Sequence, residues 1–515
     1  MVMGAETEYA IGVQWAGESV SQDVLLRRVQ QHAFNTLGYS STSTRGRFLT
    51  NAGLIYLDAG LHYEWSTPEC SGPFDVVRYL AAGDRIMRDL LMSFKDAHPD
   101  VTSVFCSRTC VDYLSKTMWA AHESYQYSRA LPQLATEMLP FLASRVILGA
   151  GGWHCDSPAL RFTLSPRAHF ITAVADRDSQ HVRPLFHTKD EPLAPNSHRL
   201  HVACSESLCS QTANVLRFGT TALVLALVER GVAFSSAVTL DSPVHALHTF
   251  AGDPTLRATA QLARGGRTSA LEIQRYYFES VSAYVSTLGL PWANDVCELW
   301  HDTLTQLEAD PASAGTLLDW GIKRRLFERH LDRHGLSWKA LADWDRVLTV
   351  LTRSWRHMGG AGFSLNLAQL QRPIPALRVH MDRLQPTLDR RGLSWDGIGA
   401  LARARAELFE LDAKFGALGD EGVFDALDAA GALEHRVMDF DVAHAVQHPP
   451  HDTRARLRGE VVRRLSESRS PYVAEWTRIY DKNHDRMLDL TDPFEQEERW
   501  LEHALVGEAP PLRGA

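Results

Sequence analysis

The order of hydrophobic and polar positions predicts strands and helices in alternation over the first hundred residues. Apolar and polar residues alternate over residues 4–13, as in a strand with one buried face. Two more strands are predicted on either side of Ala59-Gly60, and apolar residues recur at helical spacing over residues 21–37 and 74–98. The longer of these two helices is expected to cover one face of the sheet that the strands form.

The rest of the pattern predicts a mixed core followed by a helical middle third. One helix is predicted over residues 131–148, among short strand-like runs at residues 101–106, 161–164, 169–174 and 199–204. Helical spacing then dominates in residues 210–231, 271–288, 319–333 and 338–353. Strands that come first and helices that follow are typical of the α+β class.

One eight-residue segment occurs twice. Residues 331–338 read Leu-Asp-Arg-His-Gly-Leu-Ser-Trp, and residues 388–395 match them at seven of eight positions. Two copies are too few for a repeat array, which needs at least about three stacked units. The pattern instead indicates a duplicated helix connection, in which Gly ends one helix and Ser caps the next. A loop is predicted at residues 358–375, between the copies.

The length of the chain indicates more than one domain. Its 515 residues exceed the roughly 250–300 at which single cores stop growing. The proline pair Pro449-Pro450 indicates a boundary. We therefore expect a large domain at residues 1–445 and a small C-terminal domain at residues 446–515.

Composition limits the partners. The chain is 45% hydrophobic and 22% charged, and its net charge of −9 argues against a nucleic-acid-binding protein. The longest apolar run, residues 220–227, is far shorter than the ~20 residues that span a bilayer, so we expect no membrane partner. The seven cysteines are an odd number without Cys-x-x-Cys pairs or a signal peptide. This pattern is typical of reduced, buried thiols in a cytoplasmic protein rather than a zinc site.

Acidic residues cluster in strand-like segments near the N-terminus. Glu6 and Glu8 lie two apart in the first predicted strand, Tyr56 and Asp58 lie two apart in the second, and Glu64 follows. Side chains two apart on a strand share one face, so these groups can line one surface. Clustered carboxylates are the oxygen ligands that Mg²⁺ prefers, which indicates a nucleotide-metal site. The alternatives are solvated acids on a strand edge and, for Asp58, a turn role.

Ten short motifs occur in a fixed order over most of the chain. They are Gly4-Ala5-Glu6-Thr7-Glu8-Tyr9, Leu49-Thr50-Asn51, Ile55-Tyr56-Leu57-Asp58, Glu64-Trp65-Ser66-Thr67-Pro68-Glu69-Cys70, His122-Glu123-Ser124-Tyr125, Asp190-Glu191-Pro192, Arg199-Leu200-His201-Val202, Ser269-Ala270-Leu271-Glu272-Ile273-Gln274-Arg275, Asp319-Trp320-Gly321-Ile322-Lys323-Arg324 and Thr453-Arg454-Ala455-Arg456-Leu457-Arg458-Gly459-Glu460. Together they resemble the Pup ligase and depupylase family, which contains proteasome accessory factor A and the deamidase of Pup.

This resemblance implies a glutamine-synthetase-like (carboxylate-amine ligase) fold, with a curved antiparallel sheet backed by helices and a small C-terminal domain. It also implies ATP and Mg²⁺ as cofactors. Six positions match functional residues of the family: the metal ligands Glu6, Tyr56 and Glu64, the catalytic base Asp58, and the nucleotide contacts Thr67 and Trp476. For Trp476 the alternative is a place in the core.

Further candidates come from the residues themselves. Arg454 and Arg456 alternate with Arg458 along an expected strand, where they can clamp phosphate oxygens or form a salt-bridged surface. Glu8, His122 and His201 are additional site candidates. The alternative for His122 is a structural hydrogen bond, since the second histidine of a zinc helix is missing.

The resemblance breaks down at several positions. Family members have an arginine before the Tyr-x-Asp strand, a Lys-Asn-Asn triplet, an Asn and a Glu; here these positions hold Leu54, residues 106–108, Leu208 and Gln211. A compact segment of about 40 residues before the hairpin favours the ligase branch, since the depupylase branch has a long insertion there. A helical insertion at about residues 340–400 exceeds the usual ligase length.

Three functions follow as hypotheses. The first is a ligase that activates the C-terminal Glu side chain of a Pup-like protein as an acyl phosphate and joins it to lysine-bearing proteins. The second is a depupylase-like hydrolase that no longer acts on Pup and works as an isopeptidase, deamidase or nucleotide phosphohydrolase; the altered positions named above support it. The third is a binding protein without activity, against which the intact acidic residues argue.

Overall fold

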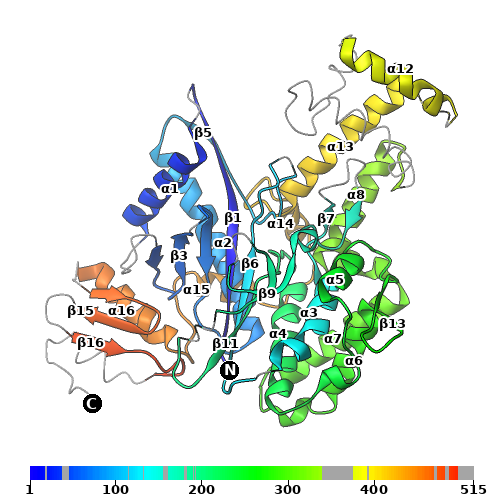
Figure 1. Cartoon of the computed structure of the whole chain (residues 1–515). Coiled ribbons are helices and arrows are strands. Elements are labelled where there is room, and N and C mark those ends of the chain that lie inside the picture. The colour runs from blue at the N-terminus through cyan, green and yellow to red at the C-terminus, as the bar shows by residue number, and fades with distance from the viewer. Residues whose placement is uncertain are drawn as a thin grey trace.

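The protein is described here by a computed structural model, which covers the chain except residues 18–19, 38–45, 59, 114, 132, 155–160, 179–181, 190, 192, 339–374, 391, 393, 469–471, 482–485 and 497–515. Within the described residues, a nine-stranded sheet forms the centre, with the order β2-β3-β4-β1-β6-β11-β10-β9 and β5 paired to β1 (Figure 1). β9 and β10 are parallel, and the other pairs of this sheet are antiparallel. Its strands are β1 (Met3–Trp15), β2 (Gly46–Phe48), β3 (Leu54–Leu57), β4 (Tyr63–Ser66), β5 (Val101–Ser107), β6 (Ala121–Tyr127), β9 (Ala173–Asp176), β10 (Pro184–His187) and β11 (His198–Val202).

One face of the sheet packs on α1 (Gln22–Thr36) and α2 (Pro73–Ala97). Tyr9, Ile55 and Trp65 come from three strands and belong to one buried cluster with residues of both helices. The Trp65 indole donates to the Tyr79 carbonyl (3.1 Å), and Gly83 leaves room for it, because a Cβ there would lie 2.3 Å from the ring. Since side chains alternate along a strand, the neighbours of these residues point to the opposite face.

The predicted strand at residues 4–13, both hairpin strands and both early helices are confirmed. The sequence pattern missed β6, a central strand, because its residues are mostly polar. The strand predicted at residues 169–174 is wrong in position. A 3₁₀ turn, η2 (Arg167–Phe170), occupies its first half, and β9 begins later.

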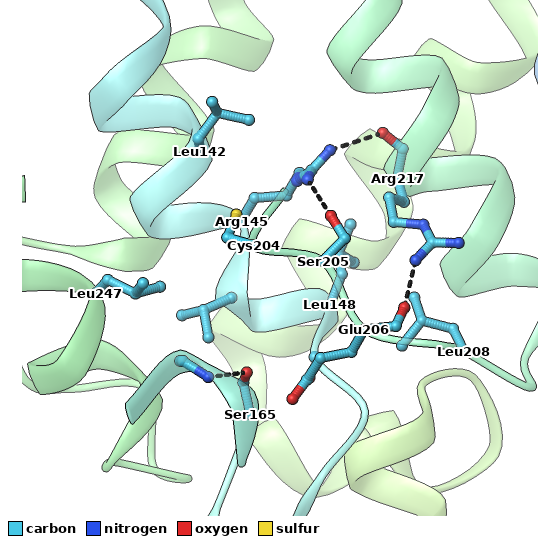
Figure 2. A pocket seen from close by; sticks show the side chains of 13 residues that line it. Leu142, Arg145, Leu148, Ser165, Cys204, Ser205, Glu206, Leu208, Arg217 and Leu247 are labelled. Carbon is cyan, nitrogen blue, oxygen red and sulfur yellow. Dashed lines mark hydrogen bonds between the residues drawn. The ribbon is translucent and has the colours of Figure 1, made fainter. Parts of the chain in front are cut away.

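A buried ionic network fastens β6 to the helices behind it. Glu123 is fully buried, and Arg145 of η1 (Arg145–Leu148) donates to its two oxygens at 2.7 and 2.8 Å. Burial alone would raise the pKa of Glu123, but Arg145 and Arg217 outweigh burial and lower it. Figure 2 shows both arginines and Ser205 around a small cavity of about 50 Å³. Because Glu123 points into this network, its neighbour His122 points to the opposite face of the sheet.

A layer of helices lies beside the sheet (Figure 1). They are α3 (Leu134–Ser144), α4 (Gln211–Glu229), α5 (Pro243–Ala251), α6 (Ala270–Ser282), α7 (Ala293–Ala309) and α8 (Asp319–Arg333). Short elements connect them: β7 (Gly152–Trp153), β8 (Phe162–Thr163), η3 (Phe234–Ser236), β12 (Thr259–Gln261), β13 (Arg267–Ser269), η4 (Val285–Thr287) and η5 (Pro311–Thr316). By length and composition α4 could cross a membrane, but 89% of its apolar window is buried, as in the core helix of a folded domain.

Two helices, α12 (Pro375–Asp389) and α13 (Trp395–Phe415), project from the body beyond α8 (Figure 1). The duplicated segment ends α8 and α12, with Gly335 and Gly392 in the left-handed region (φ 64° and 65°). The Trp338 indole donates to Glu328 (2.9 Å), and the Trp395 indole donates to Gln385 (2.8 Å), each ten residues earlier. The predicted helix connection is therefore confirmed in both copies. The helix predicted at residues 338–353 lies outside the described residues beyond its first position, and the predicted loop does so up to residue 374.

The last described elements share a separate buried cluster with the edge of the main sheet. After α14 (Val423–Ala429) and α15 (Asp439–Ala445), the chain forms α16 (Ala455–Ser468) and a sheet of β14 (Tyr472–Ala474), β15 (Arg478–Asp481) and β16 (Arg486–Asp489). Leu457, Val461, Ile479 and Leu488 pack with Phe48 of the main sheet. The strand expected for Arg454 to Arg458 is wrong, because this segment begins a helix.

Candidate active site

The acidic side chains lie on the open face of the sheet, because strand register aligns them. In one row across the sheet, Tyr56 of β3 pairs with Glu64 of β4, and Glu64 pairs with Glu8 of β1. In the next row, Glu6 pairs with His122 of β6. Directly paired residues share a face, so strands distant in sequence present these groups together.

Two adjacent cavities cover this face. The larger, of about 730 Å³, has five carboxylates on its walls together with cationic and imidazole groups: Glu6, Glu8, Asp58, Glu64, Glu191, Arg167, Arg183, Lys189, Arg199, His62, His122, His187 and His201. The smaller, of about 340 Å³, is lined by the start of β1 and by Leu54, Thr67, Glu69, Arg454 and Trp476. Glu6, Tyr56, Glu191 and Arg199 line both cavities, so the two meet there.

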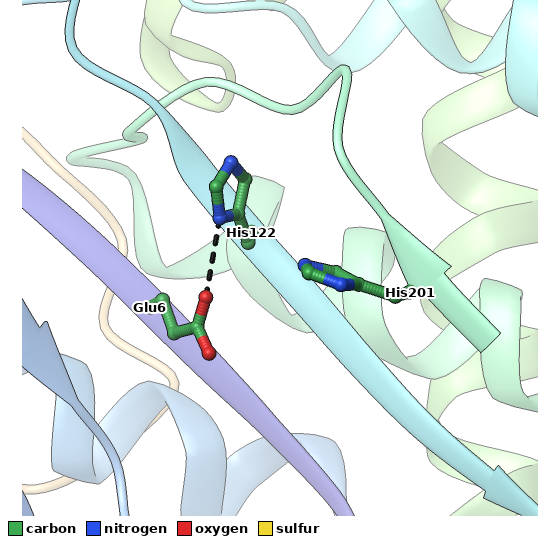
Figure 3. A group of neighbouring side chains, drawn as sticks. All are labelled: Glu6, His122 and His201. Atoms are coloured by element: carbon green, nitrogen blue, oxygen red, sulfur yellow. Dashed lines mark hydrogen bonds and ion pairs between the residues drawn. The ribbon is translucent and has the colours of Figure 1, made fainter. Parts of the chain in front are cut away.

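Glu6 is held as a carboxylate where the cavities meet. His122 Nδ1 lies 3.1 Å from one oxygen, and Arg199 Nη2 lies 3.8 Å from the other. Burial alone would raise the pKa of Glu6, but the His122 hydrogen bond and the charge of Arg199 outweigh it and lower the pKa. Figure 3 shows His201 beyond His122 from the next strand, and the three residues offer ligand atoms within 4.8 Å of one another.

Asp58 lies in the β3–β4 turn, beside Glu8 and His62. It accepts the backbone N–H of His62 at 2.6 Å, while His62 Nδ1 lies 2.8 Å from Glu8. The Ala120 N–H also donates to Glu8 (2.7 Å). Burial, followed by the charge of Glu8, raises the pKa of Asp58 against the hydrogen bond from His62. The turn role and the site position of Asp58 therefore coexist.

Glu64 of β4 and Tyr56 of β3 are directly paired, and Glu64 is close enough to Glu6, Glu8 and Asp58 to feel their charges. Burial, with the charges of Glu6 and Glu8, raises the pKa of Glu64 well above its usual range. Burial and the charge of Glu64 raise the pKa of Tyr56 as well. The group Glu6, Tyr56 and Glu64 offers oxygen donors only, and Glu64 is buried beside the carboxylates of Glu6 and Glu8. This donor set fits a hard divalent cation.

The smaller cavity contains the residues expected to contact a nucleotide. Thr67 accepts the Ala5 N–H (3.0 Å) with its hydroxyl, and Trp476 packs edge-on against Phe48 with centroids 4.9 Å apart. The side chain of Arg454 reaches this cavity and donates to Glu69 at 2.7 Å.

Arg456 does not line either cavity. Two residues along a helix turn by about 200°, so α16 puts Arg456 on the side opposite Arg454 and Arg458. Arg458 is fully buried, and its guanidinium lies over the Trp476 ring and pairs with Glu69. The helix thus directs two of the three arginines towards Glu69.

Sequence reasoning did not assign roles to several residues that line the larger cavity. His62 follows Asp58 at the spacing of a tight hairpin, and that spacing was the available signal. Glu191 and Arg199 stood in quoted motifs without a role. The others are His187 of β10, Arg167 of η2, and Arg183 and Lys189 on either side of β10, where no short pattern marked them.

Of the positions that depart from the family pattern, only Leu54 lies at the wall of a cavity on the open face of the sheet, whereas Leu208 lines the small cavity behind β6. Leu54 lines the smaller cavity. Gln211 instead accepts the backbone N–H groups of Arg436 and Val437 (2.6 and 3.0 Å), and Arg108 pairs with Asp84 (2.6 Å). Their departures concern packing between elements and leave the open face of the sheet unchanged.

Comparison with known proteins agrees with this geometry. A family model described as Pup-ligase protein matches residues 1–348 and 384–480. The Pup deamidase/depupylase of Mycobacterium tuberculosis is 31% identical over 456 residues, covering 86% of this chain and 76% of that protein. The Pup–protein ligase 1 of Rhodococcus erythropolis is 29% identical over 517 residues, covering 98% of this chain and 99% of that protein.

Two solved structures share the fold. The complex of prokaryotic ubiquitin-like protein Pup with its ligase PafA matches with a TM-score of 0.77 and 23% identity, covering 98% of this chain and 93% of that chain. PafA in complex with ADP matches with a TM-score of 0.72 and 22% identity, covering 96% of each chain. The expected sheet backed by helices is confirmed. The match to the family model over most of the chain defines an enzyme of the ATP-dependent carboxylate-amine ligase class. The chain belongs to the Pup-ligase family.

Proposed function

We propose that this enzyme uses ATP and Mg²⁺ to join a side-chain carboxylate at the C-terminus of a Pup-like protein to lysine amines of other proteins. The observation that supports this is the meeting of two cavities at Glu6, Tyr56, Glu191 and Arg199. The smaller, aromatic cavity suits a nucleotide, and the larger cavity suits the carboxylate and the amine. Phosphoryl transfer requires donor and acceptor in adjoining, aligned positions.

Glu6, Tyr56 and Glu64 are the proposed ligands of Mg²⁺. Their oxygens are the donor type that this ion prefers, and the raised pKa of Glu64 reflects its burial beside the charges of Glu6 and Glu8. His122 and Arg199 keep Glu6 ionised and oriented. When bound, Mg²⁺ neutralises phosphate charge and aligns the triphosphate for transfer.

Thr67, Trp476 and Arg454 are proposed to bind the nucleotide. The Trp476 ring offers an aromatic surface, and Arg454 supplies positive charge on the wall of the same cavity. Arg456 is not proposed as a nucleotide contact, because its side chain does not line this cavity.

Two chemical steps follow. The γ-phosphoryl group passes from ATP to the glutamate carboxylate, giving an acyl phosphate and ADP. The lysine amine then attacks the acyl carbon, phosphate leaves, and an isopeptide bond forms. Asp58 is proposed to accept the amine proton, since its raised pKa makes it a stronger base than an exposed aspartate. Arg167, Arg183 and Lys189 provide positive charge for the carboxylate and the phosphate.

The partners are proposed from the relatives. Proteins named as Pup ligases are similar over almost the whole chain, and a solved relative is in complex with Pup.

We place the reaction in the cytoplasm, because the six described cysteines are free thiols, typical of a reducing compartment. The proposed division into residues 1–445 and 446–515 puts Arg454 and Trp476 in the smaller domain and most of the cavity walls in the larger.

A depupylase-like hydrolase is the second candidate. Two observations favour it: the similarity to the Pup deamidase/depupylase, and the presence of Leu54, in place of the family's arginine, on the wall of the smaller cavity. In that reaction Asp58 would activate water or attack the isopeptide bond. The chain spans 99% of the ligase relative but 76% of the depupylase relative, which favours the ligase.

One assay separates these functions. The protein is incubated with ATP, MgCl₂, a Pup-like peptide ending in Glu and a lysine-bearing acceptor protein, while ADP, phosphate and conjugate are followed. A ligase forms conjugate and ADP in equal amounts. Phosphate without conjugate identifies a phosphohydrolase, and loss of a preformed conjugate identifies a depupylase. Absence of every product would contradict an enzymatic role.

A further inference from the structure

Two histidines and one glutamate meet outside the active site, between α8 and α13. His330 and His334 are four apart at the end of α8, so their rings share one face of the helix, with centroids 4.7 Å apart. Glu407 comes from α13. Its Oε2 atom lies 3.0 Å from His330 Nε2 and 2.8 Å from His334 Nε2. Three possible ligand atoms therefore converge on one point.

Hydrogen bonding does not account fully for this arrangement. His330 Nε2 is buried, and although it is close to Glu407, it is not in hydrogen-bond geometry with any group in the described part of the chain. Both Nε2 atoms nevertheless lie within 3.0 Å of the same carboxylate oxygen. A shared metal ion explains why two imidazole nitrogens and one carboxylate oxygen point to a common centre.

We propose that His330, His334 and Glu407 bind one Zn²⁺ ion, with water as the fourth ligand. Two imidazoles and a carboxylate are a common donor set for zinc, and imidazole favours late transition metals over Mg²⁺. Ligands at roughly 2.0–2.2 Å from a tetrahedral ion are about 3.4 Å apart, so the present separations need to open by about half an ångström. The partial exposure of His334 (32%) and Glu407 (45%) gives the ion access from solvent.

The ion would join two elements that the protein already holds together at one end. Closer to the core, Lys323 of α8 pairs with the buried Asp412 of α13 (2.8 Å). The metal ligands lie further out on the same two helices, where α13 leaves the body and leads to α12 (Figure 1). Zinc would thus fix the base of the projecting helices.

The duplicated segment supplies an internal comparison. The second copy keeps the glycine and tryptophan that build the helix connection, but Thr387 and Arg391 replace His330 and His334. Those two positions are therefore not required for the connection itself. The histidine pair occurs in the copy that faces Glu407.

The test is a zinc titration of the metal-free, full-length protein with excess MgCl₂ and ADP present. Bound Zn²⁺ is measured by equilibrium dialysis against a chromophoric chelator, and the site is probed separately by the visible spectrum of Co²⁺. We expect His334→Arg, which copies the residue of the second segment, to lose one equivalent of Zn²⁺. Glu407→Gln should weaken the same equivalent at least about tenfold, as loss of a ligand or its support does.

The control is His444→Asn. His444 and His448 are also four apart and stacked, with centroids 4.2 Å apart, and neither belongs to a described three-ligand group. The control should keep the full Zn²⁺ stoichiometry and the Co²⁺ spectrum. Unchanged circular dichroism and ADP binding in His334→Arg would exclude misfolding as the cause. Equal Zn²⁺ stoichiometry in wild type, His334→Arg and Glu407→Gln would overturn the proposal.

Discussion

Glu8 and Glu64 lie directly opposite each other on β1 and β4, and both side chains are buried. Two buried carboxylates on one face repel each other, so one of them holds a proton unless a cation is present. Burial and its acidic neighbours raise the pKa of Glu64. The metal-free protein is therefore expected to carry a proton at Glu64.

Glu64→Gln should stabilise the metal-free protein at pH 8. Because the folded state holds the Glu64 proton more tightly than the unfolded chain, wild-type stability falls as pH rises above the ordinary value of 4.5. The variant lacks this loss, so its free energy of unfolding at pH 8 should exceed that of wild type by at least ~1 kcal/mol, the equivalent of one pKa unit. Urea denaturation in EDTA at pH 5 and pH 8 measures it. Millimolar Mg²⁺ should stabilise wild type and the control Glu308→Gln, but not Glu64→Gln; a variant that loses stability at pH 8 contradicts the prediction.

Asp58→Asn should abolish conjugation and spare nucleotide binding. The amide keeps the acceptor for the His62 N–H but cannot take the proton of the lysine amine. The loss of a general base typically costs about 10²–10⁴ in rate. Conjugate formation and ADP titration are measured in parallel. The matched control is Asp112→Asn, a turn carboxylate that accepts the Ser115 N–H (3.1 Å) outside both cavities; equal rates for both variants would remove Asp58 as the base.

Glu69→Gln should destabilise the protein near neutral pH. Burial would raise the pKa of Glu69, but Arg458 and Arg454 lower it from 4.5 to about 2. Its ionised form contributes about 3 kcal/mol above pH 4.5, and this is lost as pH falls towards 2. Denaturation of wild type and variant should therefore converge at low pH. The exposed pair of Glu475 and Arg478 provides a control, where Glu475→Gln should change stability by less than about 1 kcal/mol.

Trp476→Ala should weaken ADP binding about tenfold, because a stacked aromatic surface contributes on the order of 1 kcal/mol or more. Trp476→Phe should retain most of the affinity. Arg456→Ala should leave it unchanged, since that side chain is outside the cavity wall. Calorimetric titration of the three variants with ADP measures the differences. A larger loss in Arg456→Ala than in Trp476→Ala would mean that the smaller cavity is not the nucleotide site.

Much of the local structure could be predicted, because it depends on nearby residues. Alternation over residues 4–13 gave β1, and helical spacing gave α1 and α2. The duplicated segment was read correctly because Gly335 and Gly392 adopt a backbone conformation that glycine favours. The ten short motifs indicated the family, since each of them is a contiguous segment that can be recognised without the fold.

The wrong and missing predictions share a cause in long-range contacts. β6 is a central strand although its sequence is polar, because Arg145 neutralises Glu123 from behind and Glu6 pairs with His122 in front. Neither partner is near β6 in sequence. The segment that carries the three arginines folds as a helix, because Leu457 and Val461 bury one side of this helix in a cluster with Phe48.

The sequence by itself determined which side chains are acidic, which alternate and which family they indicate. Only the tertiary structure decided the register that sets Glu8 against Glu64, the meeting of two cavities at Glu6, and the separation of Arg456 from Arg454. These relationships depend on pairing and packing between segments up to hundreds of residues apart. Local periodicity fixes the face on which a side chain lies, and only folding fixes what stands opposite it.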